Sequence, residues 1–231
     1  MVPTTLRAAF AAAALTLLVS LSLAGTGHAA GGVIQPGDEH DFTCTLNFVY
    51  DGVGSRAGEV YIGTAAHCVS SVGQQVSTRD FPNFGTVAYL GDEDRTAWDF
   101  ALIRVKPQYH ADVSAAVKGH PNYPTGYTTP SDTFLGDAVQ ISGYGMGYGW
   151  TTPTQEERVA DFMFDDQSEY GVSGPIHWGD SGGPLVHIPT GKALGIVSRL
   201  CLGVCTEEGP TVQGILAKSA ANGFPIELRT V

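Results

Sequence analysis

Short apolar stretches separated by glycine, proline and aspartate are the feature that most limits how this chain can fold. Such stretches are typical of strands bounded by turns. They lie at 45–50, 59–64, 86–90, 100–105, 138–142, 185–188 and 193–198. With 30 glycines and 13 prolines, the chain has little room for long helices, and only 217–222 suggests a helical turn. The sequence predicts an all-β fold, and the spacing alone allows a sandwich as well as barrels.

The first 29 residues have the pattern of a secretory signal peptide, and we expect 1–29 to be removed. Arg7 is followed by an apolar run over 8–24 and then by small residues, with cleavage expected after Ala29. A membrane anchor would need about 20 apolar residues, whereas hydroxyl side chains interrupt this run and no basic stop signal follows it. We therefore expect 30–231 to be secreted and extracellular, without membrane association after signal removal.

The charge balance of the chain excludes one class of partner. Twelve basic and 23 acidic residues give a formal net charge of −11, and removal of Arg7 leaves 11 basic residues and a charge of −12. Such an acidic protein is a poor partner for nucleic acid, and its acidity is adequately explained by solubility. The roughly 200 remaining residues are enough for one compact, monomeric unit with a sizeable core.

Three short segments bring together residue types suited to nucleophilic catalysis: TAAHC at 64–68, WDFAL at 98–102 and GDSGGP at 179–184. A serine hydroxyl is a poor nucleophile at neutral pH and needs a neighbouring base. That base in turn needs an anion to fix its tautomer. His67, Asp99 and Ser181 can fill these three roles. Each segment alone also has an ordinary explanation, namely a packed histidine, a capped aspartate or a glycine-rich hairpin.

The glycines around Ser181 add a second chemical element. They leave space for backbone amides and a substrate carbonyl to approach each other closely. The amides of Gly179 and Ser181 can then point into one hollow and stabilise a developing oxyanion. The occurrence of all three segments in one chain, in this order, argues against coincidence.

These motifs resemble those of trypsin-like (chymotrypsin-family) serine proteases of the secreted bacterial type. The resemblance rests on TAAHC, on DFALIRV at 99–105, on GDSGGPLV at 179–186 and on LGIVS at 194–198. It implies His67 as general base, Asp99 as its orienting partner, Ser181 as nucleophile and Ser198 as a support beside Asp99. The order His, Asp, Ser separates this family from subtilisins and α/β-hydrolases.

The same resemblance implies an architecture. It predicts two six-stranded antiparallel β-barrels packed together, with the active site in the cleft between them and a short C-terminal helix. The first barrel would cover about 30–120 and the second about 131–231, with 119–132 as the crossover. No cofactor is expected, and the implied partners are protein or peptide substrates.

Four cysteines in a secreted chain suggest two disulfides, and four cysteines allow three pairings. Local spacing favours Cys44 with Cys68 and Cys201 with Cys205. The competing interpretation, a zinc site, lacks paired C-x-x-C elements, so we expect no metal. The first bridge resembles the one beside the histidine of the family.

The resemblance also points to the walls of a substrate pocket. Trypsins carry an aspartate where this chain has Pro175, so a substrate lysine or arginine would lack its partner and we expect tryptic cleavage to be disfavoured. Leu200 replaces a glycine that usually leaves the pocket open, which predicts a shallow apolar pocket for small or medium side chains. An acidic side chain received by Arg199 or His177 is an alternative, and solvated rim residues are another. The expected substrate-binding residues are Pro175, Ile176, His177, Trp178, Ser198, Arg199 and Leu200.

The sequence also leads to an expectation about how the enzyme is activated. Many family members free an amine that inserts beside the aspartate preceding the serine, here Asp180. Only a loose likeness to that N-terminus exists at 31–37, and no basic cleavage site precedes it. We expect Asp180 to pair with an internal arginine, with Arg158 as the candidate, and the enzyme to be active once its signal is removed.

The histidines at 40, 110, 120 and 187 lack partners at metal-site spacing and are interpreted as surface or turn residues.

Two function classes follow from these residues. The leading one is a secreted serine endopeptidase that works through an acyl-enzyme intermediate. The other is a non-catalytic secreted binding protein on the same scaffold. Esterase activity is a third possibility, because the same acyl chemistry serves esters.

Overall fold

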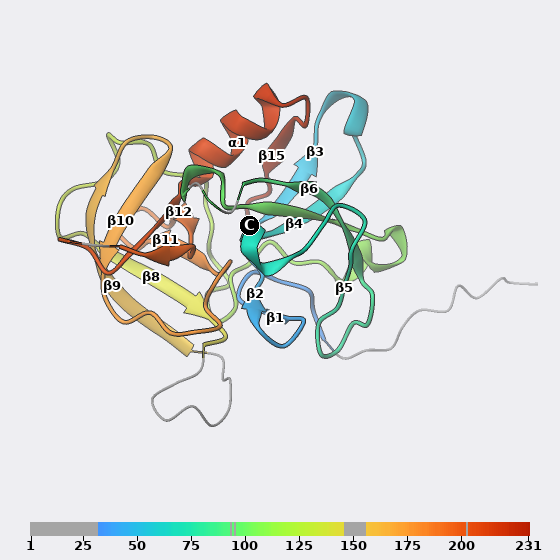
Figure 1. Ribbon diagram of the computed structural model, residues 1–231, viewed down its shortest axis with the longest axis horizontal. Coiled ribbons are helices and arrows are strands. Elements are labelled where there is room, and N and C mark those ends of the chain that lie inside the picture. The colour runs from blue at the N-terminus through green and yellow to red at the C-terminus, as the bar shows by residue number, and fades with distance from the viewer. Residues whose placement is uncertain (1–31, 93, 95, 146–155, 202) are drawn as a thin grey trace, which may run out of the picture.

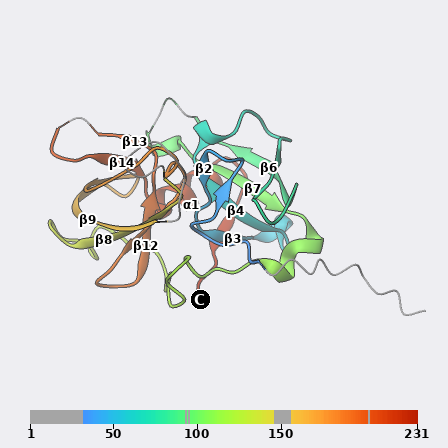
Figure 2. The same ribbon diagram turned by 90° about the horizontal axis from the view of Figure 1, so that it is seen from below.

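The computed structural model describes residues 32–92, 94, 96–145, 156–201 and 203–231. The predicted signal peptide, 1–29, lies outside the described residues. Two curled sheets stand side by side, and the helix α1 (Val212–Ala221) lies above them (Figure 1). The same division into two halves is visible from below (Figure 2). No helix in the described part of the chain has the length and apolarity needed to cross a membrane.

The first sheet contains six antiparallel strands in the order β15-β3-β4-β7-β6-β5. A two-stranded hairpin, β1 with β2, precedes it, and four short 3-10 helices lie in the loops. The elements of this half are β1 (Glu39–His40), β2 (Cys44–Thr45), β3 (Val49–Gly52), η1 (Gly54–Arg56), β4 (Val60–Thr64), η2 (Ala66–Cys68), β5 (Gln75–Val76), β6 (Gly85–Leu90), η3 (Thr96–Trp98), β7 (Ala101–Val105), η4 (Pro107–Asp112) and β15 (Ile226–Leu228).

The second sheet contains seven antiparallel strands in the order β12-β11-β8-β9-β10-β14-β13. Its elements are β8 (Ala138–Gly143), β9 (Glu156–Asp165), β10 (Glu169–Ser173), β11 (Pro184–His187), β12 (Lys192–Ile196), β13 (Arg199–Leu200) and β14 (Glu207–Pro210). The all-β class is therefore confirmed. The predicted count of six strands holds for the first sheet, while the second sheet has one more, the two-residue β13.

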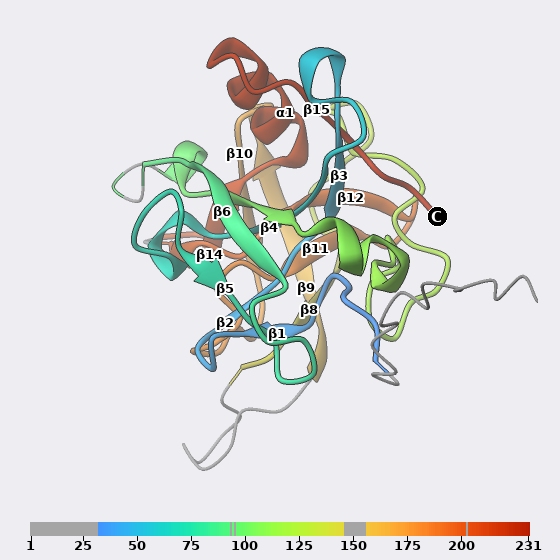
Figure 3. The same ribbon diagram turned by 90° about the vertical axis from the view of Figure 1, so that its right-hand side faces the viewer.

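The C-terminal helix is confirmed but begins earlier than the 217–222 turn suggested by the sequence. Thr211 is its N-cap, and its side-chain oxygen accepts a hydrogen bond from the N–H of Gly214 at 2.9 Å. This bond satisfies an N–H that has no partner inside the helix. After the helix, β15 pairs with β3, so the chain returns from the second half to the first (Figure 3).

Three apolar clusters form the core. One fills the first sheet and one fills the second. The third joins the two halves, because it combines Phe48 and Leu102 of the first half with Val186 and Ile196 of the second and with Ile215 of α1. Burial of these side chains fixes the two halves relative to each other. The segments that carry the candidate residues therefore face each other across one packed interface.

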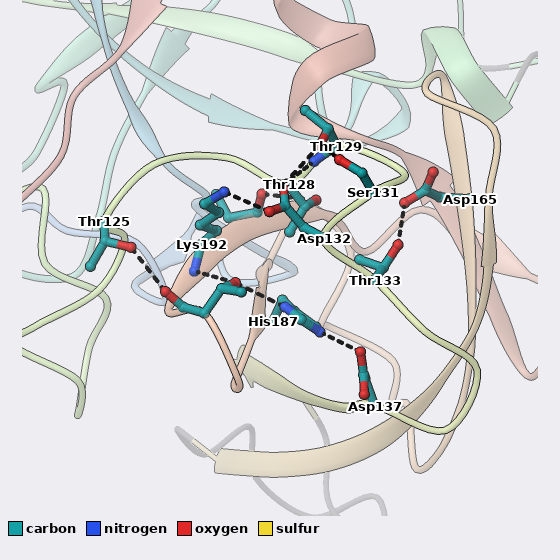
Figure 4. A network of polar contacts seen from close by, with 12 residues as sticks. Thr125, Thr128, Thr129, Ser131, Asp132, Thr133, Asp137, Asp165, His187 and Lys192 are labelled. Atoms are coloured by element: carbon teal, nitrogen blue, oxygen red, sulfur yellow. Dashed lines mark hydrogen bonds and ion pairs between the residues drawn. The ribbon is translucent and has the colours of Figure 1, made fainter.

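The crossover segment is attached to the second sheet by polar contacts (Figure 4). Lys192 Nζ donates to Asp132 Oδ1 at 2.8 Å, and the N–H of Thr128 donates to the carbonyl of Ala193 at 2.9 Å. His187 Nε2 lies 3.0 Å from Asp137 Oδ2. These contacts hold the connection between the two halves against β11 and β12.

The interpretation of two histidines as surface or turn residues is wrong. His187 is 1% exposed and His40 is fully buried. Each is compensated by hydroxyl or carboxylate partners: His40 Nε2 lies 2.7 Å from Thr64 Oγ1, and His187 Nδ1 lies 2.9 Å from Thr190 Oγ1. Buried polar groups need such partners, and the fold supplies them from distant or turn residues.

Both predicted disulfides are present. Cys44 is bonded to Cys68, and Cys201 is bonded to Cys205. No free cysteine remains among the described residues. The first bridge joins the hairpin of β1 and β2 to η2, the 3-10 turn that contains His67.

Candidate active site

His67 and Asp99 are brought together by the pairing of β4 with β7. Thr64 at the end of β4 lies opposite Ala101 at the start of β7. His67 lies in η2, directly after β4, and Asp99 directly precedes β7. Two segments separated by 32 residues in the chain therefore end at the same edge of the first sheet.

The carboxylate of Asp99 holds His67 at two points. Asp99 Oδ2 lies 2.8 Å from His67 Nδ1, and Oδ1 accepts the main-chain N–H of His67 at 3.0 Å. Ser198 Oγ also donates to Oδ2 at 2.5 Å. Burial raises the pKa of Asp99, but the hydrogen bonds from His67 and Ser198 outweigh this effect and leave the pKa below its ordinary value. An ionised Asp99 favours the tautomer with a proton on Nδ1, which leaves Nε2 able to accept one.

Ser181 lies in a turn of the second half that packs directly against the first. The N–H of Thr45 donates to the carbonyl of Ser181 at 2.8 Å. The following residue, Gly182, has φ of +86°, and a Cβ there would overlap Thr64 Oγ1 and the carbonyl oxygen of Thr45. Only glycine permits both this conformation and this approach. The turn therefore sits against the end of β4 that leads to His67.

Ser181 and His67 line the same cavity, which has a volume of about 500 Å³. No hydrogen bond joins the Ser181 hydroxyl to the His67 ring in the described part of the chain. Such contacts are often long in the absence of substrate and shorten in the substrate complex. The fold thus brings the three residues to one cavity, with the His–Asp contact formed.

The backbone around Ser181 offers two amide donors. Gly179 has φ of +104°, a conformation that favours glycine. Among the described residues, the N–H groups of Gly179 and Ser181 donate to no other backbone group, whereas the N–H of Asp180 between them donates to His177. Two unused amides beside a hydroxyl can stabilise negative charge on a carbonyl oxygen.

Asp180 pairs with Arg158, as predicted from the sequence. Arg158 Nη2 forms an ion pair with Asp180 Oδ2, and the two side chains are 8% and 0% exposed. The N–H of His177 donates to the same oxygen at 2.7 Å. Burial raises the pKa of Asp180, and Arg158 opposes this effect. This pair fixes the backbone just before Ser181 without using the N-terminus of the chain.

Comparison with known proteins decides which family this geometry represents. The profile of the family described as "Trypsin-like peptidase domain" matches residues 47–196. The chain belongs to the trypsin-like peptidase family. No curated protein sequence matches this peptidase-family chain significantly.

Solved structures of bacterial proteases share the fold of this trypsin-like chain. Protease A of Thermobifida fusca is 21% identical, covers 87% of this chain and 100% of its own length, and superposes with a TM-score of 0.59. The chymotrypsin of Cellulomonas bogoriensis is 18% identical over 86% of this chain and 100% of its own, with a TM-score of 0.52. At this level of identity the likeness concerns the fold.

Most of the residues predicted to contact substrate line the cavity of this trypsin-like peptidase. Pro175 is the exception, because it is absent from the lining. Trp178 and Leu200 are each 69% exposed and stand at the rim. The predicted residues that do line the cavity are Ile176, His177, Trp178, Ser198, Arg199 and Leu200.

Three further lining residues were missed by the sequence analysis: Asp94, Val197 and Glu207. Glu207 is 1% exposed, and its Oε1 accepts the N–H of Ser198 at 2.6 Å. Burial raises the pKa of Glu207 well above the ordinary value for glutamate. Its only signal in the sequence is an acidic pair, Glu207 with Glu208, in a stretch too polar to be recognised as a strand.

Proposed function

We propose that this chain is a secreted serine endopeptidase that hydrolyses peptide bonds through an acyl-enzyme intermediate. The observation that carries the proposal is the His67–Asp99 contact at the edge of the cavity that Ser181 also lines. Family membership supports it, because the fold is that of peptidases. Ser181 is the proposed nucleophile, His67 the base and Asp99 its orienting partner.

The first half of the reaction forms the acyl-enzyme. Ser181 Oγ attacks the carbonyl carbon of the scissile peptide bond while its proton passes to His67 Nε2. The carbonyl oxygen becomes an oxyanion, which the N–H groups of Gly179 and Ser181 stabilise. The C–N bond then breaks, and the leaving amine takes the proton from His67.

The second half releases the product. A water molecule attacks the acyl carbon and gives its proton to His67, and the oxyanion forms again between the same two amides. The bond to Ser181 Oγ breaks, and the serine recovers a proton from His67. Asp99 stays ionised throughout and stabilises the positive form of His67.

Secretion belongs to the same proposal. It is supported by the signal-like sequence of 1–29 and by the two disulfides, which persist in oxidising compartments. A monomer acting on proteins or peptides is the proposed working form.

The sequence also led to a prediction about which substrate side chain the cavity prefers. Pro175 and Leu200 led to the prediction of a shallow apolar pocket in which lysine and arginine are disfavoured, and this stays a prediction. It took no account of Glu207, a buried carboxyl group that also lines the cavity.

A fluorophosphonate probe with a peptide substrate tests the proposed function. We expect the protein 30–231 to be labelled at Ser181, as located by mass spectrometry, and to cleave a denatured protein. Ser181→Ala should lose labelling and at least 10⁴-fold of the activity. Folded protein that shows no labelling would favour the non-catalytic binding protein. Labelled protein that hydrolyses esters and never peptides would favour an esterase.

A further inference from the structure

Thr45 joins the first half of the molecule to the turn that contains Ser181 through two hydrogen bonds. Its main-chain N–H donates to the carbonyl of Ser181 at 2.8 Å, and its side-chain Oγ1 donates to the carbonyl of Gly179 at 2.7 Å. Thr45 is fully buried, so bulk water has no access to these bonds. The first bond can be made by any residue with an N–H, whereas the second needs a hydroxyl group.

The direction of the Thr45 hydroxyl is determined by a further partner. Its oxygen accepts the main-chain N–H of Tyr144 at 2.9 Å. A hydroxyl group donates one hydrogen bond, and a main-chain N–H can only donate. The single proton of the hydroxyl is therefore committed to the carbonyl of Gly179.

The Thr45 contacts complete the hydrogen bonding of the turn. The carbonyl of Asp180, between the two that Thr45 holds, accepts the N–H of Gly183 at 2.7 Å. Three consecutive carbonyl groups thus have partners. Among the described residues, the N–H groups of Gly179 and Ser181 have no backbone acceptor and stay available for an oxyanion.

Gly179 is the point at which the turn needs such a restraint. Its φ is +104°, and glycine has more conformational freedom than any other residue. Without the Thr45 hydroxyl, the carbonyl of Gly179 would lose its buried donor, which is costly. Rotation of the peptide group after Gly179 would relieve this cost and would displace the neighbouring N–H groups.

We propose that Thr45 is a positioning residue whose hydroxyl keeps the Gly179 turn in the conformation that stabilises the oxyanion. This rests on the proposed peptidase function. Thr45 acts through Gly179 and does not touch the reacting atoms. Its neighbour Cys44 is bonded to Cys68, next to His67. The two consecutive residues of β2 therefore hold the segment that carries the base and the segment that carries the nucleophile.

Thr45→Val and Thr45→Ser, measured on the peptide that the wild type cleaves best, test the proposal. Thr45→Val keeps the shape of the side chain and the main-chain N–H but removes the hydroxyl, whereas Thr45→Ser keeps the hydroxyl. Because the two amide donors are displaced, Thr45→Val should lower kcat about 10- to 100-fold with KM within about threefold. Thr45→Ser should restore kcat to within about threefold of the wild type.

A peptide aldehyde and the corresponding peptide alcohol separate lost oxyanion binding from general distortion. The Ser181 hydroxyl adds to the aldehyde carbon, its proton passes to His67, and the aldehyde oxygen becomes an oxyanion between the two amides. The alcohol binds without this step. Thr45→Val should raise Ki for the aldehyde by the factor by which kcat falls, and it should leave Ki for the alcohol unchanged.

Thr128→Val is the matched control, because Thr128 is 2% exposed and its hydroxyl also donates to a main-chain carbonyl, that of Ala193 at 3.5 Å. It should keep the wild-type kcat. A fall in melting temperature that Thr128→Val shares with Thr45→Val measures the loss of a buried hydroxyl alone. Thr45→Ala gives the same comparison if Thr45→Val does not fold.

Three results would overturn the role of Thr45. They are a folded Thr45→Val with the wild-type kcat, a Thr45→Ser as slow as Thr45→Val, and an equal rise in Ki for aldehyde and alcohol. Fluorophosphonate labelling separates the two proposals. An unlabelled wild type contradicts the peptidase function itself, whereas any of the three results in a labelled enzyme contradicts only the role of Thr45.

Discussion

At the scale of single residues, Asp99 has the most completely determined environment in the site. It is 1% exposed, and both carboxylate oxygens accept hydrogen bonds, from His67 and from Ser198. Its pKa lies below the ordinary value, so it is ionised at neutral pH. The stability that Asp99 contributes is present above its unfolded pKa and is lost as the pH falls through the lowered folded pKa.

Asp99→Asn should therefore separate geometry from charge. The amide keeps the size of the side chain but cannot favour a proton on His67 Nδ1, so we expect kcat/KM to fall about 10⁴-fold at neutral pH. Urea unfolding measures the second effect. Across the range below pH 4, the free energy of unfolding should fall less with decreasing pH in the variant than in the wild type. Asp51→Asn, which alters a surface pair with Arg229, is the control, and near-normal activity in Asp99→Asn would contradict the assigned role.

At the scale of elements, the contact between the Ser181 turn and the end of β4 positions the nucleophile. Gly182 allows this contact because a side chain there would meet Thr64 and Thr45. The three candidate residues lie in separate segments of the chain. The close approach of the Ser181 turn to the end of β4 therefore decides whether Ser181 reaches His67 and Asp99.

Gly182→Ala should displace the turn and abolish most activity, by at least 100-fold, with a lower melting temperature. Gly73→Ala is a matched control, because Gly73 also has a positive φ, +94°, but nothing within 4 Å of its added Cβ. Thermal unfolding measures the conformational strain that the two variants share, and fluorophosphonate labelling measures the effect specific to the turn. Equal labelling of the two variants would show that the close approach is unimportant.

The elements also show what the sequence can predict. The strands β4, β6, β7, β8, β11 and β12 were predicted because each is a short apolar run between turn residues. β9, β10 and β14 were missed: β9 is solvated on one face, with Val159 53% exposed and Phe162 4% exposed, and β14 begins with two glutamates. Alternation diluted by charged residues gives too weak a signal for single-sequence reading.

The candidate site also contains both residues that the sequence could predict and residues that it could not. His67, Asp99 and Ser181 were predictable because each lies in a short contiguous motif. The position of Glu207 in the cavity wall was not, since it depends on β14 pairing with β13 and so placing a carboxyl group beside Ser198. The burial of His40 likewise depends on Thr64, a partner 24 residues away that approaches only in the folded chain.

At the scale of the whole molecule, the Arg158–Asp180 pair links β9 to the turn before Ser181, and we expect it to make the site independent of the N-terminus. The pair lies almost entirely inside the protein. Removing one partner of a buried pair leaves an uncompensated charge, which typically costs about 3–5 kcal/mol.

Two versions of the protein test this independence. A chain starting at Ala30 and the same chain with a Gly-Ser extension should have kcat/KM values within about twofold. Arg158→Met should lose most labelling and about 3–5 kcal/mol of unfolding free energy in urea. An extension that abolishes activity would instead show that a free N-terminal amine is needed.

The return of β15 to the first sheet has a consequence for biosynthesis. The edge next to β3 stays open until residues 226–228 have been made, so the sheet that positions His67 and Asp99 is completed by a segment that follows the second sheet in the chain. The first sheet is therefore finished only after the strands of the second sheet have been synthesised.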